Sequence, residues 1–548
     1  MIRVTELKLA LDHAVEALPL LVAQTLGIAA GDLIGHTVFK RSFDARKAEL
    51  LVVYIVDVEL TNPALEQAVL ERHTGNPHIF AAPDMNYRLV AQAPANPGLR
   101  PVVVGFGPCG IFAALMLAQM GFQPIVLERG KKVRERTQDT WNLWRKHVLD
   151  PESNVQFGEG GAGTFSDGKL YSQIKDPRFL GRKVMNEFVK AGAPPEILVD
   201  AHPHIGTFKL VKMVENLREQ IIALGGEIRF GQRVTDVLIE VDANGRHVRG
   251  LTVLDQALGQ SYELRADQVV LALGHSSRDT FAMLYQRGVA MEAKPFSIGF
   301  RIEHPQSLID RARWGRHAGH PLLGAADYKL VHHASNGRSV YSFCMCPGGA
   351  VVAATSELGR VVTNGMSQYS RKERNANAGI VVGIEPRDYP QDSASPPALS
   401  GIALQRTLES QAYILGGADY SAPVQLLGDF LAGKASTQFG AVEPSYQPGV
   451  TLCDLSAALP GYATDAIREA LRAFGNKIKN FDRPDAILTG VETRTSSPLK
   501  MPRGEDFQSS NTPGLYPAGE GAGYAGGILS AGVDGIKVAE AVARSLPG

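Results

Sequence analysis

Cysteine is scarce in this sequence, and neither sign of charge is in excess. The 548 residues include four cysteines, which are Cys109, Cys344, Cys346 and Cys453. Four are too few to cross-link a chain of this length into a disulfide scaffold. Lysine plus arginine and aspartate plus glutamate both total 56, so the formal net charge is zero. Proteins that bind nucleic acids or membrane surfaces usually carry an excess of basic residues, which this sequence lacks. We therefore expect neither a nucleic acid nor a membrane as a partner.

Long apolar runs are also missing from the N-terminus. Residues 1–18, MIRVTELKLALDHAVEAL, carry charges throughout, unlike a signal peptide or a membrane span. No cysteine and histidine spacing typical of zinc is found, so no metal site is expected. The composition, with 44% hydrophobic and 20% charged residues, is that of an ordinary globular protein. We therefore predict a cytoplasmic protein with a sizeable core.

A glycine-rich turn directly follows the apolar strand VVV in PVVVGFGPCGIFAALMLAQMGFQPIVLERG. Its glycines allow a tight turn, close approach of a pyrophosphate and close helix packing, and the helix N-terminus attracts phosphate. Glu128 ends the next strand, about 20 residues on, where an acid accepts from a ribose 2′-hydroxyl. The pattern predicts FAD or NAD. The turn residues expected to contact it are Gly105, Gly107, Pro108, Cys109 and Gly110.

A second glycine turn lies near the C-terminus, in LYPAGEGAGYAGGILSAGVDG. It resembles the second FAD fingerprint of the glutathione-reductase superfamily, in which the acid after Gly519 accepts from the ribityl chain; here that acid is Glu520. The next helix begins near Gly526, Gly527 and Ile528, so its positive end would face the flavin. The resemblance favours FAD over NAD. A helix start with a solvent-facing Glu520 is the alternative.

Two more segments resemble parts of the same superfamily. VVLALGHSS contains Ala272 and Gly274 in an Ala-Thr-Gly-like turn, with leucine in place of threonine, and RFGQRVTDV contains Val234 on a strand whose backbone would meet the adenine. The basic segment after Glu128 offers Arg129 to stack near the adenine and Arg136 to reach a phosphate. A solvated helix face explains these charges equally well.

The densest glycine cluster is VQFGEGGAGTFSDGKL, residues 155–170. Such a cluster suits a loop that needs unusual dihedral angles or close backbone approach. We expect it to pass along the flavin, although a flexible surface loop is the plain alternative. Whether its charged residues touch the flavin or the substrate is open. The contact residues expected here are Gly161, Ala162, Gly163, Thr164, Asp167, Gly168 and Lys169.

Several longer motifs, among them NVQFGEGGAGTFSDGKL, FSIGFRIEHPQ, SFCMCPGG and GYAGGILSAGVDGIKVAEA, extend the resemblance to nearly the whole chain. Together they are similar to a bacterial family of uncharacterised FAD-dependent dehydrogenases with a small N-terminal domain. The resemblance implies an FAD-binding oxidoreductase with a discontinuous Rossmann-like domain and an inserted substrate domain. It names no substrate.

The expected fold is α/β, with four segments. Residues 1–95 follow the order strand, helix, strand, strand, helix, strand of a ferredoxin-like domain, with the last strand near residues 79–90. Residues 96–290 form the first part of the FAD-binding domain, 291–479 a mixed α+β substrate or cap domain, and 480–548 the C-terminal part of the FAD-binding domain. Residues 291–479 contain no second glycine fingerprint. NAD(P)H would then visit the flavin only transiently, or the substrate itself would reduce it.

Candidate catalytic residues are few, because a flavin performs hydride transfer itself. Cys344 and Cys346 stand two apart, so on a regular strand both thiols would project from one face. A redox pair, a flavin-facing thiol or two small semi-buried side chains would each fit. His204 is a candidate acid or base, against a structural histidine.

The leading functional hypothesis is an FAD-dependent oxidoreductase acting on a small molecule. A flavin-dependent tRNA-modifying enzyme is one alternative, which the neutral charge disfavours. A non-catalytic flavin-binding sensor is another.

Overall fold

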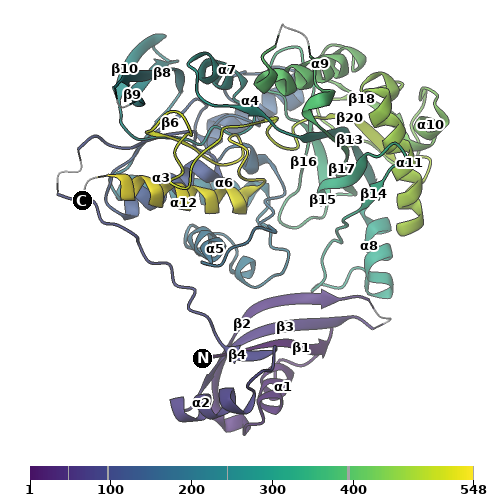
Figure 1. The fold of residues 1–548 in the computed structure, drawn as a ribbon. Helices are drawn as coiled ribbons and strands as arrows, with labels where there is room; N and C mark the ends of the chain where they lie inside the picture. The colour runs from purple at the N-terminus through teal and green to yellow at the C-terminus, as the bar shows by residue number, and fades with distance from the viewer. Residues whose placement is uncertain (47–48, 96–97, 244, 392–394, 547–548) are drawn as a thin grey trace.

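The computed structural model describes residues 1–46, 49–95, 98–243, 245–391 and 395–546. The fold is mixed α/β, and within these ranges four sheets have three or more strands. Figure 1 shows a small N-terminal sheet at one end of the molecule, joined to a larger body by an extended segment. Among the helices in the described ranges, none is long and apolar enough to cross a membrane.

The N-terminal sheet is antiparallel, with the strand order β2-β3-β1-β4. Its elements are β1 (Ile2–Ala10), α1 (Ala17–Leu26), β2 (Leu33–Asp44), β3 (Leu51–Leu60), α2 (Pro63–Arg72) and β4 (Ile79–Ala81). The last strand is shorter than the predicted residues 79–90. Pro83 has no N–H to donate to a sheet, and the Tyr87 hydroxyl donates to Glu540 in the larger body at 2.8 Å. The chain therefore leaves the sheet early.

A five-stranded parallel sheet forms the centre of the larger body, in the order β22-β11-β5-β6-β7. Its strands are β5 (Val102–Val104), β6 (Ile125–Glu128), β7 (Glu227–Phe230), β11 (Val269–Leu271) and β22 (Leu515–Pro517). The three valines of β5 are buried, as expected for a parallel strand covered on both faces.

Helices from both ends of the chain cover one face of this sheet. In Figure 1, α3 (Pro108–Gln119) and α12 (Ile528–Ser545) lie side by side, with α5 (Leu180–Lys190) and α6 (Thr207–Ala223) near them. A Cβ at Gly535 of α12 would collide with the backbone of α3. The opposite face is covered by an antiparallel sheet of β8 (Gln232–Asp242), β9 (Gly245–Asp255) and β10 (Gln260–Arg265).

An eight-stranded sheet forms the rest of the body. Its strands are β13 (Phe296–Pro305), β14 (Val331–His333), β15 (Ser339–Ala353), β16 (Thr363–Met366), β17 (Asn375–Ile384), β18 (Ala422–Leu426), β19 (Val450–Leu452) and β20 (Ile487–Glu492). Because β20 pairs with β13 and β18, the sheet extends past the predicted boundary at residue 479. Between β14 and β20 the helices are α9 (Ser400–Leu415), α10 (Leu427–Ala432) and α11 (Gly461–Lys477).

Candidate functional site

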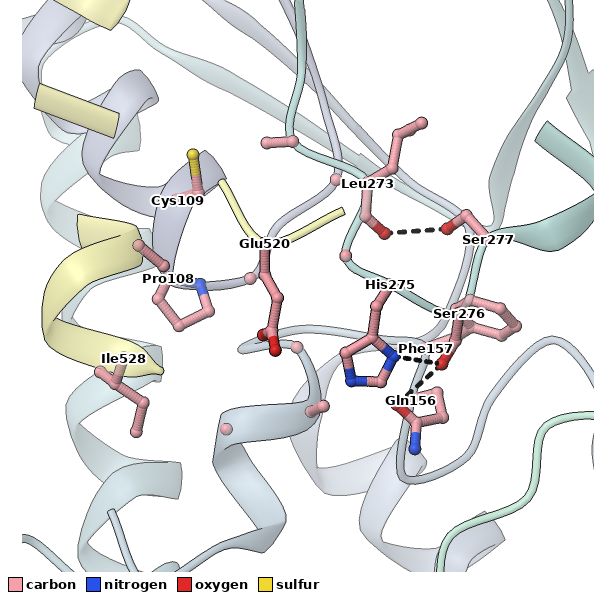
Figure 2. A pocket seen from close by; sticks show the side chains of 18 of the residues that line it. Pro108, Cys109, Gln156, Phe157, Leu273, His275, Ser276, Ser277, Glu520 and Ile528 are labelled. Atoms are coloured by element: carbon pink, nitrogen blue, oxygen red, sulfur yellow. Dashed lines mark hydrogen bonds between the residues drawn. The ribbon is translucent and has the colours of Figure 1, made fainter. Parts of the chain in front are cut away.

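A cavity of about 460 Å³ opens at the carboxyl ends of β5, β6, β11 and β22. This is the edge of a parallel sheet at which ligands usually bind, and the volume lies in the usual range of roughly 300–1,000 Å³ for cofactor pockets. Figure 2 shows that Pro108, Gln156, His275, Glu520 and Ile528 surround the space. Distant parts of the sequence therefore build one site.

The glycine turn after β5 forms one wall. A Cβ at Gly105 would collide with the carbonyl oxygen of Ala272, and one at Gly110 with the carbonyl oxygen of Gly105. Gly107 is the N-cap of α3, and Pro108 occupies the first helical turn, where its missing N–H is not needed. The turn thus brings the positive end of α3 to the cavity.

Glu128 ends β6 and is buried, with 5% of its surface exposed. Its carboxylate accepts hydrogen bonds from the backbone N–H groups of Phe106 at 2.9 Å, Gly130 at 2.8 Å and Gly158 at 2.9 Å. It also lines the cavity. The carboxylate therefore ties the turn after β5 to the glycine cluster and presents its edge to the space.

The glycine cluster packs directly on the first glycine turn. Gly161 has a φ of +65°, and a Cβ there would lie 2.7 Å from the Cα of Gly107. A Cβ at Gly130 would collide with Gly158, and one at Gly163 would lie 3.0 Å from Ile528 Cγ1. The cluster is glycine-rich because two backbone segments approach each other at the cavity wall.

Arg136 supports this cluster from behind. Its buried guanidinium donates to the carbonyl oxygens of Asn154 at 2.8 Å, Val155 at 2.7 Å, Glu159 at 2.7 Å and Gly161 at 2.8 Å. Burial lowers its pKa to about 10. The prediction that Arg136 contacts a phosphate is therefore wrong. Its guanidinium is used in hydrogen bonds to backbone carbonyl groups, and the residue does not line the cavity.

Arg129 lies at the Glu128 end of the cavity, near Val234. Its guanidinium stacks 4.1 Å from the centre of the Phe157 ring and pairs with Glu152 at 3.0 Å and Asp279 at 2.8 Å. These contacts hold a flat, cationic side chain in place at the cavity wall.

The C-terminal glycine turn forms the opposite wall. The Gly519 N–H donates to Asp534 at 2.7 Å, and a Cβ at Gly519 would lie 2.9 Å from the Cβ of Cys109. Gly519 is thus a packing position between the two turns. Gly526, Gly527 and Ile528 line the cavity where α12 begins.

Glu520 extends into the cavity beside this turn (Figure 2). Burial raises the pKa of its carboxyl group to about 7, although Lys294 nearby opposes the shift; the Cys344 thiolate adds to it. Glu520 therefore holds a proton for part of the time near neutral pH.

Asp167 and Lys169 follow the glycine cluster and have different roles. Asp167 accepts from Ser367 Oγ at 2.6 Å and from Arg371 Nε at 3.0 Å. Burial raises its pKa, but Arg371 outweighs burial and the net shift is downward. In the described part of the chain, Lys169 Nζ forms neither an ion pair nor a hydrogen bond with a protein group. Lys169 thus leaves a positive charge at the wall that it lines with Gly168.

Cys344 reaches the cavity from β15, whereas Cys346 lies behind it and is fully buried. A bulge between Phe343 and Cys346 gives Cys344 a φ of +44°, so the expected regular alternation is broken. The Cys346 thiol donates to the Cys344 carbonyl oxygen at 3.4 Å. A hydrogen bond from Cys346, with the charges of Lys169 and Arg301, lowers the pKa of Cys344 to about 6 against the effect of burial.

A relative from Clostridium beijerinckii (strain ATCC 51743 / NCIMB 8052), described as an uncharacterised protein, is 45% identical over 541 residues, which cover 98% of each chain. Residues 295–495 match the family model "FAD-dependent protein, C-terminal domain-like". The chain belongs to a family of FAD-dependent proteins. Residues 1–59 of this FAD-dependent protein match a domain of unknown function.

Solved structures resemble the chain more distantly. E. coli quinol fumarate reductase FrdA is 14% identical, with 81% of this chain and 70% of that chain covered and a TM-score of 0.35. Glycine oxidase from Bacillus cereus ATCC 14579 is 11% identical, with 82% and 95% covered and a TM-score of 0.35. Such low scores carry no information about the substrate.

FAD is the cofactor, and the cavity of this FAD-dependent protein fits it. Glycine at positions 105 and 161 lets backbone segments meet closely at the cavity wall, because a Cβ at Gly105 would collide with the Ala272 carbonyl oxygen and one at Gly161 with the Gly107 Cα. Close packing of this kind is typical of dinucleotide-binding turns. The N-termini of α3 and α12 both begin at the cavity, so two partial positive charges meet there. Glu128 supplies the carboxylate at the end where a ribose is expected.

Most predicted contact residues come together in this cavity. The residues that line it are Gly105, Gly107, Pro108, Cys109, Glu128, Arg129, Gly161, Ala162, Gly163, Asp167, Gly168, Lys169, Val234, Ala272, Gly274, Glu520, Gly526, Gly527, Ile528 and Cys344. The predicted residues outside the lining are Gly110, Arg136, Thr164, Gly519, Cys346 and His204.

His204 is not placed as a cavity acid or base. Its Nε2 bonds the carbonyl oxygen of Tyr369 at 2.9 Å, and its ring stacks on that tyrosine at 5.3 Å. Burial lowers the pKa of the imidazole. The predicted catalytic role of His204 is therefore replaced by a structural one, in which the imidazole connects its loop to the loop of Tyr369.

A polar chain in the cavity wall was not predicted. Ser276 Oγ donates to Gln156 at 3.1 Å and lies 3.0 Å from His275 Nδ1 (Figure 2). Arg494 Nη1 donates to the same hydroxyl at 3.0 Å. Burial, with the charges of Arg494 and Arg278, lowers the pKa of His275 to about 3, so this imidazole is neutral. The signal in the sequence that could have indicated this polar wall is the run of three polar residues, HSS, that follows Gly274 in VVLALGHSS.

Proposed function

We propose that the protein is an FAD-dependent oxidoreductase that transfers hydride between a small-molecule substrate and FAD. The observation that supports this most is one cavity that joins both glycine turns to Lys169, Cys344 and Glu520. These three groups offer a cation, a thiol and a proton-holding carboxyl at the same end of the space. A bound FAD would supply the hydride chemistry.

The lining suggests an orientation for the cofactor. Glu128, Arg129 and Val234 would hold the adenosine, and the N-terminus of α3 the diphosphate. The glycine cluster and the start of α12 would contact the flavin ring. Lys169 would then balance negative charge at the reacting end, and Glu520 would hold or release a proton there.

We also infer a discontinuous Rossmann-like FAD-binding domain of the glutathione-reductase superfamily, with an inserted substrate domain and a ferredoxin-like N-terminal domain. The parallel sheet, the β2-β3-β1-β4 order and the inserted eight-stranded sheet support this division. NAD(P)H is proposed only as a transient visitor. A cytoplasmic location stays a prediction, supported by four cysteines that are all free.

Anaerobic spectroscopy tests the proposal. Purified protein should be yellow, and NADH, NADPH or a candidate metabolite should bleach the flavin band faster than it bleaches free FAD under the same conditions. Gly107→Val should lower FAD retention, because a valine at the N-cap of α3 would add apolar bulk to the cavity lining, where a Cβ would already contact the Gly161 Cα at 3.5 Å. A flavin that no compound of the panel reduces would contradict the proposed activity and favour a sensor.

A further inference from the structure

The two thiols on β15 are built into one unit at the cavity. Cys344 lines the space, and the thiol of Cys346 lies directly behind it, within hydrogen-bonding distance of the Cys344 carbonyl oxygen. On a regular strand the peptide between them would hold them apart, but the bulge at Cys344 changes the local geometry. A φ of +44° is unusual for a residue with a side chain, and such strain concentrates at functional positions.

Two nearby cationic side chains favour a reactive thiol at Cys344, and a glycine on the neighbouring strand leaves space for the sulfur of Cys346. Arg301 donates to the Cys344 carbonyl oxygen at 3.2 Å, and Lys169 brings a second positive charge from the glycine cluster. Neighbouring cations stabilise a thiolate. On β16, a Cβ at Gly365 would collide with Arg301 Nη1 and lie 2.5 Å from Asn377 Oδ1. It would also lie 3.0 Å from Cys346 Sγ, so glycine there keeps space for this group of side chains.

Cys344 also lies at the end of the cavity where the flavin ring is proposed. A thiolate at Cys344 raises the pKa of Glu520, which extends from the C-terminal glycine turn. The positive charge of Lys169 in turn lowers the pKa of Cys344. Cys344 therefore stands among the groups expected at the reacting end of FAD, rather than at the Glu128 end.

We propose that Cys344 and Cys346 are a redox-active pair that exchanges two electrons with bound FAD. In this step each thiol loses one proton and one electron, one S–S bond forms between the two sulfurs, and FAD takes up two electrons and two protons. The reverse step reduces the disulfide and reoxidises the flavin. The proposal rests on the proposed function, because it requires FAD in this cavity.

An anaerobic reductive titration counts the electrons. After oxidation with ferricyanide and removal of the reagent, the holoprotein should take up about four electrons per FAD from dithionite, two for the flavin and two for the disulfide. Cys344→Ser and Cys346→Ser should each take up about two. Cys453→Ser changes a cysteine directly after β19, at the opposite edge of the eight-stranded sheet from β15. This variant should still take up about four electrons.

Thiol counting gives a readout without variants or turnover. Ferricyanide-oxidised protein, unfolded in an alkylating reagent, should show two alkylated cysteines and a linked Cys344 and Cys346; after reduction all four should be alkylated. Uptake of two electrons with four alkylated cysteines before reduction would overturn the proposal. That result would not affect the test of flavin reduction by a substrate. The cysteine pair can therefore be disproved while the proposed oxidoreductase activity stands. If a serine variant does not fold, the wild-type counts decide.

Discussion

At the residue scale, the decisive property of the cavity glycines is what a side chain would meet. Gly161 and Gly433 both have a positive φ, of +65° and +67°, but their ψ angles differ, at −170° and +36°. A Cβ at Gly161 would lie 2.7 Å from the backbone of Gly107, whereas nothing lies within 4 Å of one at Gly433. Gly161 therefore combines a backbone conformation that is nearly restricted to glycine with a close backbone contact, whereas Gly433 is a left-handed helix cap with open space around it.

We predict that Gly161→Ala lowers both stability and FAD retention. Gly433→Ala, a control at a left-handed helix cap outside the cavity lining, should cost only the roughly 1 kcal/mol of a left-handed alanine and keep its FAD. Gly161→Ala should cost more, since its backbone conformation suits only glycine and the backbone of Gly107 must move, and it should lower flavin content after dialysis at least about tenfold, or 1.4 kcal/mol. Thermal unfolding and absorbance measure both. Equal behaviour of the two variants would contradict the packing argument.

A second prediction at this scale concerns the pH dependence that Glu520 imposes. Its folded pKa of about 7 is above the ordinary value, so the folded state holds a proton that the unfolded chain releases above about pH 4.3. Stability should therefore fall as pH rises from about 4 to 7, by on the order of 3 kcal/mol.

Glu520→Gln should remove this dependence. Relative to wild type, the variant should gain stability between pH 5 and pH 8 in thermal unfolding. The exposed Glu505→Gln serves as the control and should follow wild type. A constant difference between Glu520→Gln and wild type at both pH values would refute the assignment.

At the element scale, the contact between α3 and α12 brings the two glycine turns of the cavity together. Gly535 stands inside α12, where glycine normally weakens a helix by about 1 kcal/mol relative to alanine. A Cβ there would collide with the Cys109 carbonyl oxygen and lie 3.1 Å from the Ala113 nitrogen. Close packing of the helices therefore outweighs helix propensity.

We expect Gly535→Ala to destabilise the protein despite the better helix former. Overpacking of this kind costs about 1–3 kcal/mol, and separation of the helices should also weaken FAD binding. Gly461→Ala, at the start of α11 with nothing within 4 Å of the new Cβ, should be neutral or slightly stabilising. Urea unfolding compares the two. A gain in stability for Gly535→Ala would show that the helices can part freely.

At the scale of the whole molecule, backbone hydrogen bonds connect the N-terminal sheet to the cavity wall. Arg41 on the edge strand β2 donates to the Val199 carbonyl at 2.8 Å and accepts from the Ala201 N–H at 2.9 Å. A few residues on, Leu170 donates to the Pro203 carbonyl at 2.9 Å. Leu170 directly follows the cavity residue Lys169. The segment 199–205 thus lies between the N-terminal sheet and the cavity wall.

Arg41→Pro should loosen this connection. Proline removes the N–H that donates to Val199 but spares the opposite edge of β2. Amide exchange at Leu170, which hydrogen exchange with mass spectrometry reports at peptide level, should become about tenfold faster. Arg41→Ala keeps the N–H and loses only the ion pair with Asp200, worth up to about 1 kcal/mol. Unchanged exchange in Arg41→Pro would show that the two parts are independent.

Much of the site was predictable because its signals are local. The turn at Gly105, the acid at Glu128 and the turn at Glu520 each follow a strand at short range, and all three residues line the cavity. Arg136 was misplaced because a basic helix residue looks the same in sequence whether it meets a phosphate or four carbonyl groups. The wall residue Gln156 was missed because its partner, Ser276, is 120 residues away.

The sequence by itself determined the two glycine turns that line the cavity, since their glycine spacing and strand–helix order act over about ten residues. Only the tertiary structure decided which charges are free and which thiol faces the cavity. Asp167 pairs with Arg371 through a contact between loops about 200 residues apart, and Lys169 has no charged partner among the described residues. A bulge in β15 places Cys344 at the cavity and Cys346 behind it. Such pairings depend on how distant segments pack, which short-range patterns do not encode.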